Sequence, residues 1–103
     1  MSSRFILVID DASKEQRDII TKRLDNLKDH GYGYWHWMEA MWLISGAPDK
    51  IEPSAISKWL ERTPGIEKLT FVVFKVNGPC PYWGRGNDEG WVWMEKNWEG
   101  GPM

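Results

Sequence analysis

Tryptophan is the residue that most constrains this chain, because eight of its 103 residues are tryptophan. Each indole offers a large apolar surface and one N–H that needs a hydrogen-bond partner when it is buried. Five of the eight fall in two short stretches, at residues 35–42 and 91–93. A core of this size closes with fewer indoles, so the sequence predicts that several of them face a ligand or a second subunit.

The composition is that of a globular protein and excludes several other classes. With 42% hydrophobic and 27% charged residues, the chain is ordinary for one folded domain. Its net charge of −2 argues against a protein that coats DNA through a strongly basic face. Cys80 is the one cysteine, so no disulfide within the chain is possible. The N-terminal apolar run is too short for a signal peptide and no stretch approaches a membrane span, so we expect a cytoplasmic protein without a membrane partner.

The first part of the chain predicts a strand followed by a helix. Residues 5–9 are a continuous, β-branched apolar run, which is typical of a strand that is buried on both faces. Ser13 and Gln16 have the spacing of a capping box, and apolar residues then recur at helical intervals up to Leu27. Gly31 predicts the end of this helix, since glycine readily adopts the left-handed conformation of a C-cap.

The middle of the chain predicts a hairpin, a second helix and a further strand. Aromatic and apolar residues fill 34–38 and 41–45, with a turn between them. A single long strand with a bulge at Glu39 is the alternative. Pro53 suits the first turn of a helix, and residues 69–76 are the clearest strand of the chain.

The resulting order, β-α-β-β-α-β, predicts an α+β fold. Two right-handed β-α-β units that share a sheet form the split β-α-β, ferredoxin-like sandwich, a four-stranded antiparallel sheet with two helices on one face. We expect the first and last strands to be central, because both are apolar throughout. Residues 1–103 then form a single domain, with its core at about 4–76, a tryptophan-rich C-terminal extension at 77–99 and a disordered tail at 100–103.

The extension leaves two structures open. Trp91, Met94 and Trp98 recur at helical spacing, whereas residues 91–93 alone fit an edge strand.

If both helices of the sandwich cover one face of the sheet, the other face is bare, and the hairpin carries bulky apolar residues at both sets of alternate positions. A large exposed apolar patch usually marks an interface. We therefore expect a homodimer formed through the open face or through a sheet edge.

Several short motifs follow one another along the chain. They are an opening strand that ends in aspartate, a Trp-His pair, a Trp-Leu-Ile run, a Phe-Val-Val strand and a closing aromatic-Trp-Gly segment: Val8-Ile9-Asp10, Trp35-His36, Trp42-Leu43-Ile44, Phe71-Val72-Val73 and Tyr82-Trp83-Gly84. Over about residues 5–98 this order resembles the small SinR-like family. That family is related in fold to the ferredoxin-like subunit of CRISPR spacer acquisition and to the GhoS-type antitoxin. The resemblance implies a ferredoxin-like fold and a dimer.

The resemblance also implies a candidate catalytic residue. In some members of the CRISPR-related group, an aspartate at the end of the first strand serves metal-dependent cleavage of phosphodiesters, and by position Asp10 matches it. The chain departs from that group in two respects. It continues into a tryptophan-rich extension, and it lacks the strongly basic surface expected of a DNA-bridging subunit.

Asp10 and Asp11 are the candidate metal ligands, because Mg²⁺ prefers carboxylate oxygens that converge on one point. No second acidic cluster in the chain completes such a site, so it needs an aspartate from each subunit of a dimer. The alternative is that one of the two caps the helix that follows, as aspartate often does. Apart from this Mg²⁺, we expect no cofactor.

The aromatic residues are the main candidates for ligand binding. Exposed indoles stack on nucleobases, and Arg85, in the polar loop at 84–90, is suited to donate two hydrogen bonds to an anion. His36 is a candidate general base or ligand, with a packed structural histidine as the alternative. The predicted ligand- or partner-binding residues are Trp35, His36, Trp37, Trp42, Trp83, Arg85, Trp91 and Trp93. The alternative is that these tryptophans fill the core and a dimer interface.

The sequence therefore predicts a non-catalytic, homodimeric binding module with a tryptophan-rich surface. Its ligand is a protein partner or a nucleotide or nucleic acid. By kinship alone, the resemblance adds a role in defence against mobile elements or in counter-defence. Two alternatives stay open: a metal-dependent endonuclease that uses Asp10 across a dimer, and an antitoxin-like regulator that acts on RNA.

Overall fold

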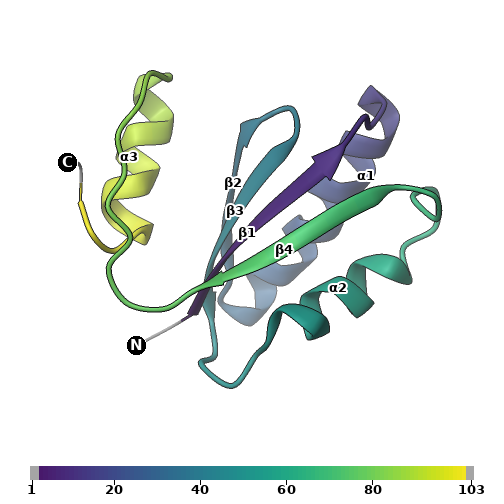
Figure 1. Ribbon diagram of the computed structural model, residues 1–103, viewed down its shortest axis with the longest axis horizontal. Helices are drawn as coiled ribbons and strands as arrows, with labels where there is room; N and C mark the ends of the chain where they lie inside the picture. The colour runs from purple at the N-terminus through teal and green to yellow at the C-terminus, as the bar shows by residue number, and fades with distance from the viewer. Residues whose placement is uncertain (1–2, 102–103) are drawn as a thin grey trace.

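The computed structural model describes residues 3–101 and contains a sheet of four antiparallel strands with three α-helices (Figure 1). In chain order the elements are β1 (Ser3–Asp10), α1 (Lys14–Asp25), a short 3-10 helix (Asn26–His30), β2 (Gly33–Met38), β3 (Met41–Ala47), α2 (Pro53–Glu61), β4 (Thr70–Val76) and α3 (Asp88–Asn97). The strand order is β2-β3-β1-β4. This small α+β fold is compatible with the ferredoxin-like arrangement expected from the sequence.

The central strands differ from the prediction, because they are β1 and β3, while β4 lies at an edge. Leu7 of β1 has Trp42 of β3 on one side and Val73 of β4 on the other. The prediction was wrong because it took an apolar strand to be buried on both faces. In β4 only one face packs on the helices, and on the other face Val72 and Phe74 are 46% and 54% exposed.

Helix α1 begins as the sequence predicts. The Ser13 hydroxyl accepts a hydrogen bond from the Gln16 backbone N–H, and the Gln16 side chain accepts one from the Ser13 backbone N–H. The 3-10 turn that follows α1 ends at Gly31, whose φ of 87° is the left-handed conformation expected of a C-cap. Since Ser13 is the N-cap, the alternative that Asp10 or Asp11 caps this helix is wrong.

Helices α1 and α2 lie on the same face of the sheet and close the main core (Figure 1). Pro53 stands in the first turn of α2, as predicted, where its missing N–H leaves no helical hydrogen bond unmade. The buried members of the main core are Phe5, Leu7, Ile9, Ile20, Leu24, Trp42, Ile44, Ala47, Ile56, Leu60 and Ile66.

The predicted hairpin is confirmed, with its turn at residues 39–40 between β2 and β3. The register of the two strands shifts between His36 and Met38, so an irregularity lies beside the turn. Alternate side chains of a strand point to opposite faces. Trp42 accordingly joins the main core, whereas Leu43 points to the other face of the sheet.

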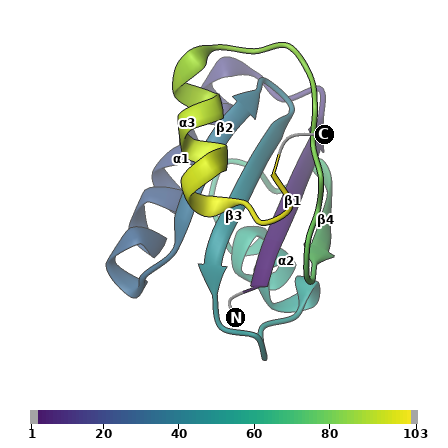
Figure 2. The same ribbon diagram turned by 90° about the vertical axis from the view of Figure 1, so that its left-hand side faces the viewer.

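The other face is covered in part by the chain's own C-terminal extension. The helical alternative for residues 91–98 is the correct one up to Asn97, where α3 ends. Figure 2 shows α3 in front of β2 and β3, and its Met94, with Trp98 just beyond, is buried against Leu43 in a second core. The expectation of a homodimer assumed a bare face, and that assumption is wrong where α3 lies.

The extension is fixed to β1 through Arg4, which is 3% exposed. Its guanidinium donates hydrogen bonds to the carbonyl oxygens of Gly78 and Glu99. It also lies 5.0 Å from the centroid of the Trp98 ring and 3.9 Å from the Glu99 carboxylate. A buried charge is tolerated only with such partners, so Arg4 ties both ends of the extension to the first strand.

The end of the described chain pairs with the start of the extension. The Cys80 N–H donates to the Glu99 carbonyl at 2.8 Å, and the Tyr82 N–H donates to the Gly101 carbonyl at 3.3 Å. Gly100 lies so close to Cys80 that a Cβ on it would be 2.6 Å from the Cys80 backbone. In the tail that the sequence predicted to be disordered, Gly101 thus accepts a hydrogen bond and Gly100 lies close to Cys80, while residues 102–103 lie outside the described residues.

Candidate binding site

Four of the predicted binding tryptophans meet between β2 and α3. Trp35 and Trp37 are alternate residues of β2, so both point to the face that α3 covers. The Trp37 and Trp91 rings lie edge to face with centroids 4.9 Å apart, and those of Trp35 and Trp93 lie 6.5 Å apart at 27°. All four are half-buried. Their packing holds α3 on the hairpin.

This close approach depends on glycines of the extension. A Cβ on Gly90, in the first turn of α3, would lie 2.2 Å from the Trp37 ring and 3.0 Å from the Trp35 Nε1. A Cβ on Gly86 would lie 2.6 Å from the same Trp37 ring. The Asn87 side chain caps α3 by accepting a hydrogen bond from the Gly90 N–H at 2.7 Å. These glycines therefore make room for Trp37.

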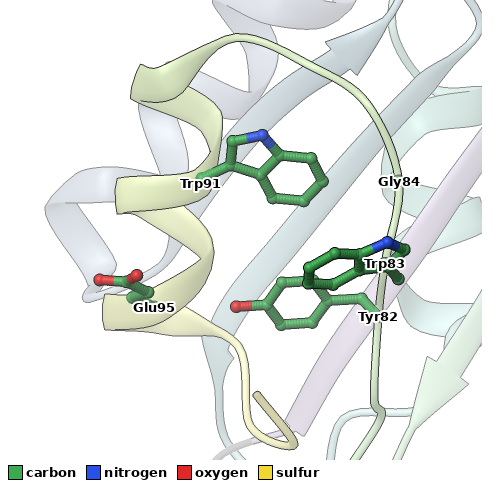
Figure 3. Close-up of a pocket in the computed structure, with 5 residues that line it drawn as sticks. All are labelled: Tyr82, Trp83, Gly84, Trp91 and Glu95. Atoms are coloured by element: carbon green, nitrogen blue, oxygen red, sulfur yellow. The ribbon is translucent and has the colours of Figure 1, made fainter. Parts of the chain in front are cut away.

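Beside this contact, a cavity of about 250 Å³ opens between α3 and the segment that precedes it (Figure 3). We call it the aromatic groove, and its lining residues are Tyr82, Trp83, Gly84, Trp91 and Glu95. The Tyr82 and Trp91 rings are nearly parallel, at 8°, with centroids 6.0 Å apart. Trp83 is 78% exposed, more than any other large apolar side chain in residues 3–101.

The aromatic groove has an acidic side. Burial raises the pKa of the Tyr82 hydroxyl, and the negative charge of Glu95 raises this pKa further. Within residues 3–101, Glu95 forms no salt bridge. Residues 77–101 carry four carboxylates against two cationic side chains, Arg85 and Lys96. The charge that a ligand meets in the groove is therefore negative.

Trp42 and His36 lie on the opposite face of the sheet, away from the aromatic groove. Trp42 is fully buried, and its indole N–H donates to the Thr21 hydroxyl at 3.2 Å. The His36 ring stacks on Trp42 with centroids 4.0 Å apart and an angle of 6°, and its Nε2 lies 3.3 Å from the Glu39 carbonyl oxygen. This arrangement is that of a packed histidine over a core indole.

The groove brings together only part of the predicted set. Trp83 and Trp91 line it, while Arg85 lies exposed in the same loop without lining it. Tyr82 and Glu95 were not predicted. Glu95 could have been found from its position four residues after Trp91, because residues at this spacing lie on one side of a helix. The sequence did not decide between a helix and a strand for residues 91–98, so this spacing could not be used.

Asp10 and Asp11 lie outside the groove. Asp10 is exposed at the end of β1, opposite Thr70. Asp11 has a φ of 52° and borders a separate hollow of about 150 Å³ with Arg17 and Glu39. Within the described range, no three side chains of His, Cys, Asp or Glu are grouped so as to hold a metal ion. A magnesium site on Asp10 therefore still depends on a second subunit.

Fold and site together define a small α+β protein with an aromatic groove between α3 and the segment before it. No family model, curated protein or solved structure matches the chain. In the part of the chain that the structure describes, no helix is both long and apolar enough to cross a bilayer.

Proposed function

We propose that this protein is a non-catalytic binding module whose aromatic groove receives a short segment of a partner protein. Trp83 is the observation that carries the proposal. It is 78% exposed, and it lines the same cavity as the nearly parallel rings of Tyr82 and Trp91. Exposed aromatic side chains are enriched where proteins bind one another, and Trp83 belongs to neither of the two cores.

The charge of the groove favours a protein segment over a nucleotide. A phosphate bound there would lie near the Glu95 carboxylate, and the lining holds no Lys or Arg to bind it. The proposal keeps two expectations from the sequence: that the protein forms a homodimer, and that it is kin to the SinR-like family. An endonuclease would need a second subunit to complete a metal site on Asp10, because within residues 3–101 no three His, Cys, Asp or Glu side chains are grouped to hold a metal ion.

The proposal is tested by photo-crosslinking from the groove. Trp83 is replaced by p-benzoylphenylalanine, which forms covalent adducts with a protein that lies against it, and the cells that naturally contain the protein are irradiated. Lys58, an exposed residue of α2, carries the same replacement in the control. We expect discrete protein adducts from position 83 and none from position 58. Equal adduct patterns from both positions, or none from position 83, would contradict the proposal.

The non-catalytic part of the proposal has a separate test. Purified protein is incubated with single-stranded and duplex RNA and DNA in Mg²⁺ or Mn²⁺, and the products are resolved on denaturing gels. We expect no cleavage above that of a blank. Cleavage that Asp10→Ala abolishes would replace the binding module with a metal-dependent endonuclease.

A further inference from the structure

The molecule already uses its tryptophans to hold arginine side chains. The Arg4 guanidinium lies 5.0 Å from the centroid of the Trp98 ring and 3.9 Å from the Glu99 carboxylate. The Arg23 guanidinium lies 4.4 Å from the centroid of the Trp59 ring. A guanidinium is attracted to the face of an indole by the negative charge of the π system, and Arg4 adds a carboxylate to that contact.

The aromatic groove offers the same groups without the cation. Trp91 and Tyr82 supply ring surface, and Glu95 supplies the carboxylate. Trp91 and Glu95 stand four residues apart on α3, and both line the groove. In Figure 3 the Trp91 ring extends toward Tyr82 and Trp83, whereas the Glu95 carboxylate points away from the rings. The cation–π contacts found in residues 3–101 use Trp98, Trp59 and Tyr34, and none uses a ring of the groove.

We infer that the aromatic groove binds an arginine side chain of the partner protein, an inference that rests on the proposed function and names what the groove recognises. The guanidinium is planar, so it stacks on rings such as those of Tyr82 and Trp91, which are themselves nearly parallel. Its fork of N–H donors pairs with a carboxylate such as that of Glu95. A lysine ammonium is a compact, strongly hydrated charge and gains less from both contacts.

The first experiment measures recognition of arginine directly. The indole N–H signals of Trp83 and Trp91 are followed by NMR while the peptide acetyl-Gly-Gly-Arg-Gly-Gly-amide is added. The same peptide with citrulline, which keeps the size and shape but removes the charge, is the matched control. We expect saturable shifts of both signals with the arginine peptide and at least about tenfold weaker binding of the citrulline peptide, as for the loss of a charge-assisted contact.

The second experiment locates the contact on the protein. Trp83→Ala removes an exposed ring that belongs to neither core, so the fold is retained while the groove loses one wall. Glu95→Gln removes only the carboxylate. Each substitution is expected to lower the affinity for the arginine peptide by about fivefold or more. Glu89→Gln makes the same change in charge on α3 but outside the groove lining, and it is expected to change the affinity less than twofold.

The outcomes separate this inference from the proposed function. The same titrations are made with a lysine peptide, a trimethyllysine peptide and AMP. If one of these probes shifts the indole N–H signals of Trp83 and Trp91 at a lower concentration than the arginine peptide does, the groove is a binding site but the inference is overturned. An equal loss of affinity for the arginine peptide in Glu95→Gln and Glu89→Gln also overturns the inference, because the attraction is then a general effect of charge. If no probe shifts either signal and position 83 yields no adducts, the proposed function fails as well.

Discussion

Trp42 and Trp83 place the same side chain in opposite environments. Trp42 is fully buried, with its N–H bonded to Thr21 and its ring stacked on His36, whereas Trp83 is 78% exposed. We expect Trp42→Ala to lower the free energy of unfolding by about 3–5 kcal/mol, since it leaves a large cavity and an unpaired hydroxyl. Trp83→Ala is expected to cost less than about 1 kcal/mol. Urea unfolding followed by circular dichroism measures both, and a similar loss in the two variants would contradict this assignment.

Tyr34 predicts a loss of stability in alkali. Burial, together with the hydrogen bond of 2.6 Å that it donates to Asp25, raises the pKa of its hydroxyl to about 12. Because the pKa in the folded state lies above the usual value of 10.0, the contribution is complete below pH 10 and is lost as the pH rises toward 12. Tyr34→Phe is expected to flatten the fall of the unfolding midpoint over this window. It will not abolish the fall, since burial also raises the pKa values of Tyr32 and Tyr82.

Asp25, which accepts this hydrogen bond, predicts a loss of stability in acid. The hydrogen bond from Tyr34 is the largest cause that lowers the pKa of Asp25, and Lys28 adds to it. Because the folded pKa lies below the usual 3.8, the contribution is present above that pH and is lost as the pH falls through the folded value. In Tyr34→Phe, the decline in midpoint below pH 4 is expected to be shallower. Equal slopes for the variant and the unsubstituted protein, at both ends of the pH range, would show that the bond does not form in solution.

At the scale of elements, the packing of α3 against β2 depends on Gly90, which has no side chain. Alanine normally favours a helix over glycine by about 0.8–1.0 kcal/mol. At Gly90 that gain is opposed by a Cβ that would lie 2.2 Å from the Trp37 ring. We therefore expect Gly90→Ala to destabilise the protein and to release α3 from β2, with faster hydrogen exchange of the backbone N–H groups in residues 88–97. Glu89→Ala is the control, because it places alanine one residue earlier in α3. It is not expected to release α3 from β2.

The elements that local chemistry determines were predictable from the sequence, and those that depend on distant contacts were not. The capping box at Ser13, the left-handed Gly31 and the Pro53 helix start are each set by neighbouring residues. The position of β4 at an edge depends on which strands pair with β1, and no local pattern gives this. The groove depends on a helix that packs through Gly90, so its Glu95 wall could not be predicted while residues 91–98 allowed two structures.

At the scale of the whole molecule, the chain buries more indole than the sequence led us to expect. A third layer, α3 with the segment before it, shelters the tryptophans of β2, so that of the eight only Trp83 is exposed. The count of tryptophans therefore no longer requires a second subunit. The remaining argument for self-association is the uncovered part of the same face, where Val72 and Phe74 of the edge strand β4 are exposed.

The predicted homodimer can thus be tested at a defined place. An edge strand with exposed apolar side chains readily pairs with another strand, so we expect sedimentation velocity to show a dimer that Phe74→Glu converts to monomer. Val92→Glu introduces the same charge at a residue of α3 that is 50% exposed, and it is expected to leave the dimer intact. A protein that sediments as a monomer at high micromolar concentration would remove the homodimer. The aromatic groove would be untouched by that result, because all five of its lining residues come from one chain.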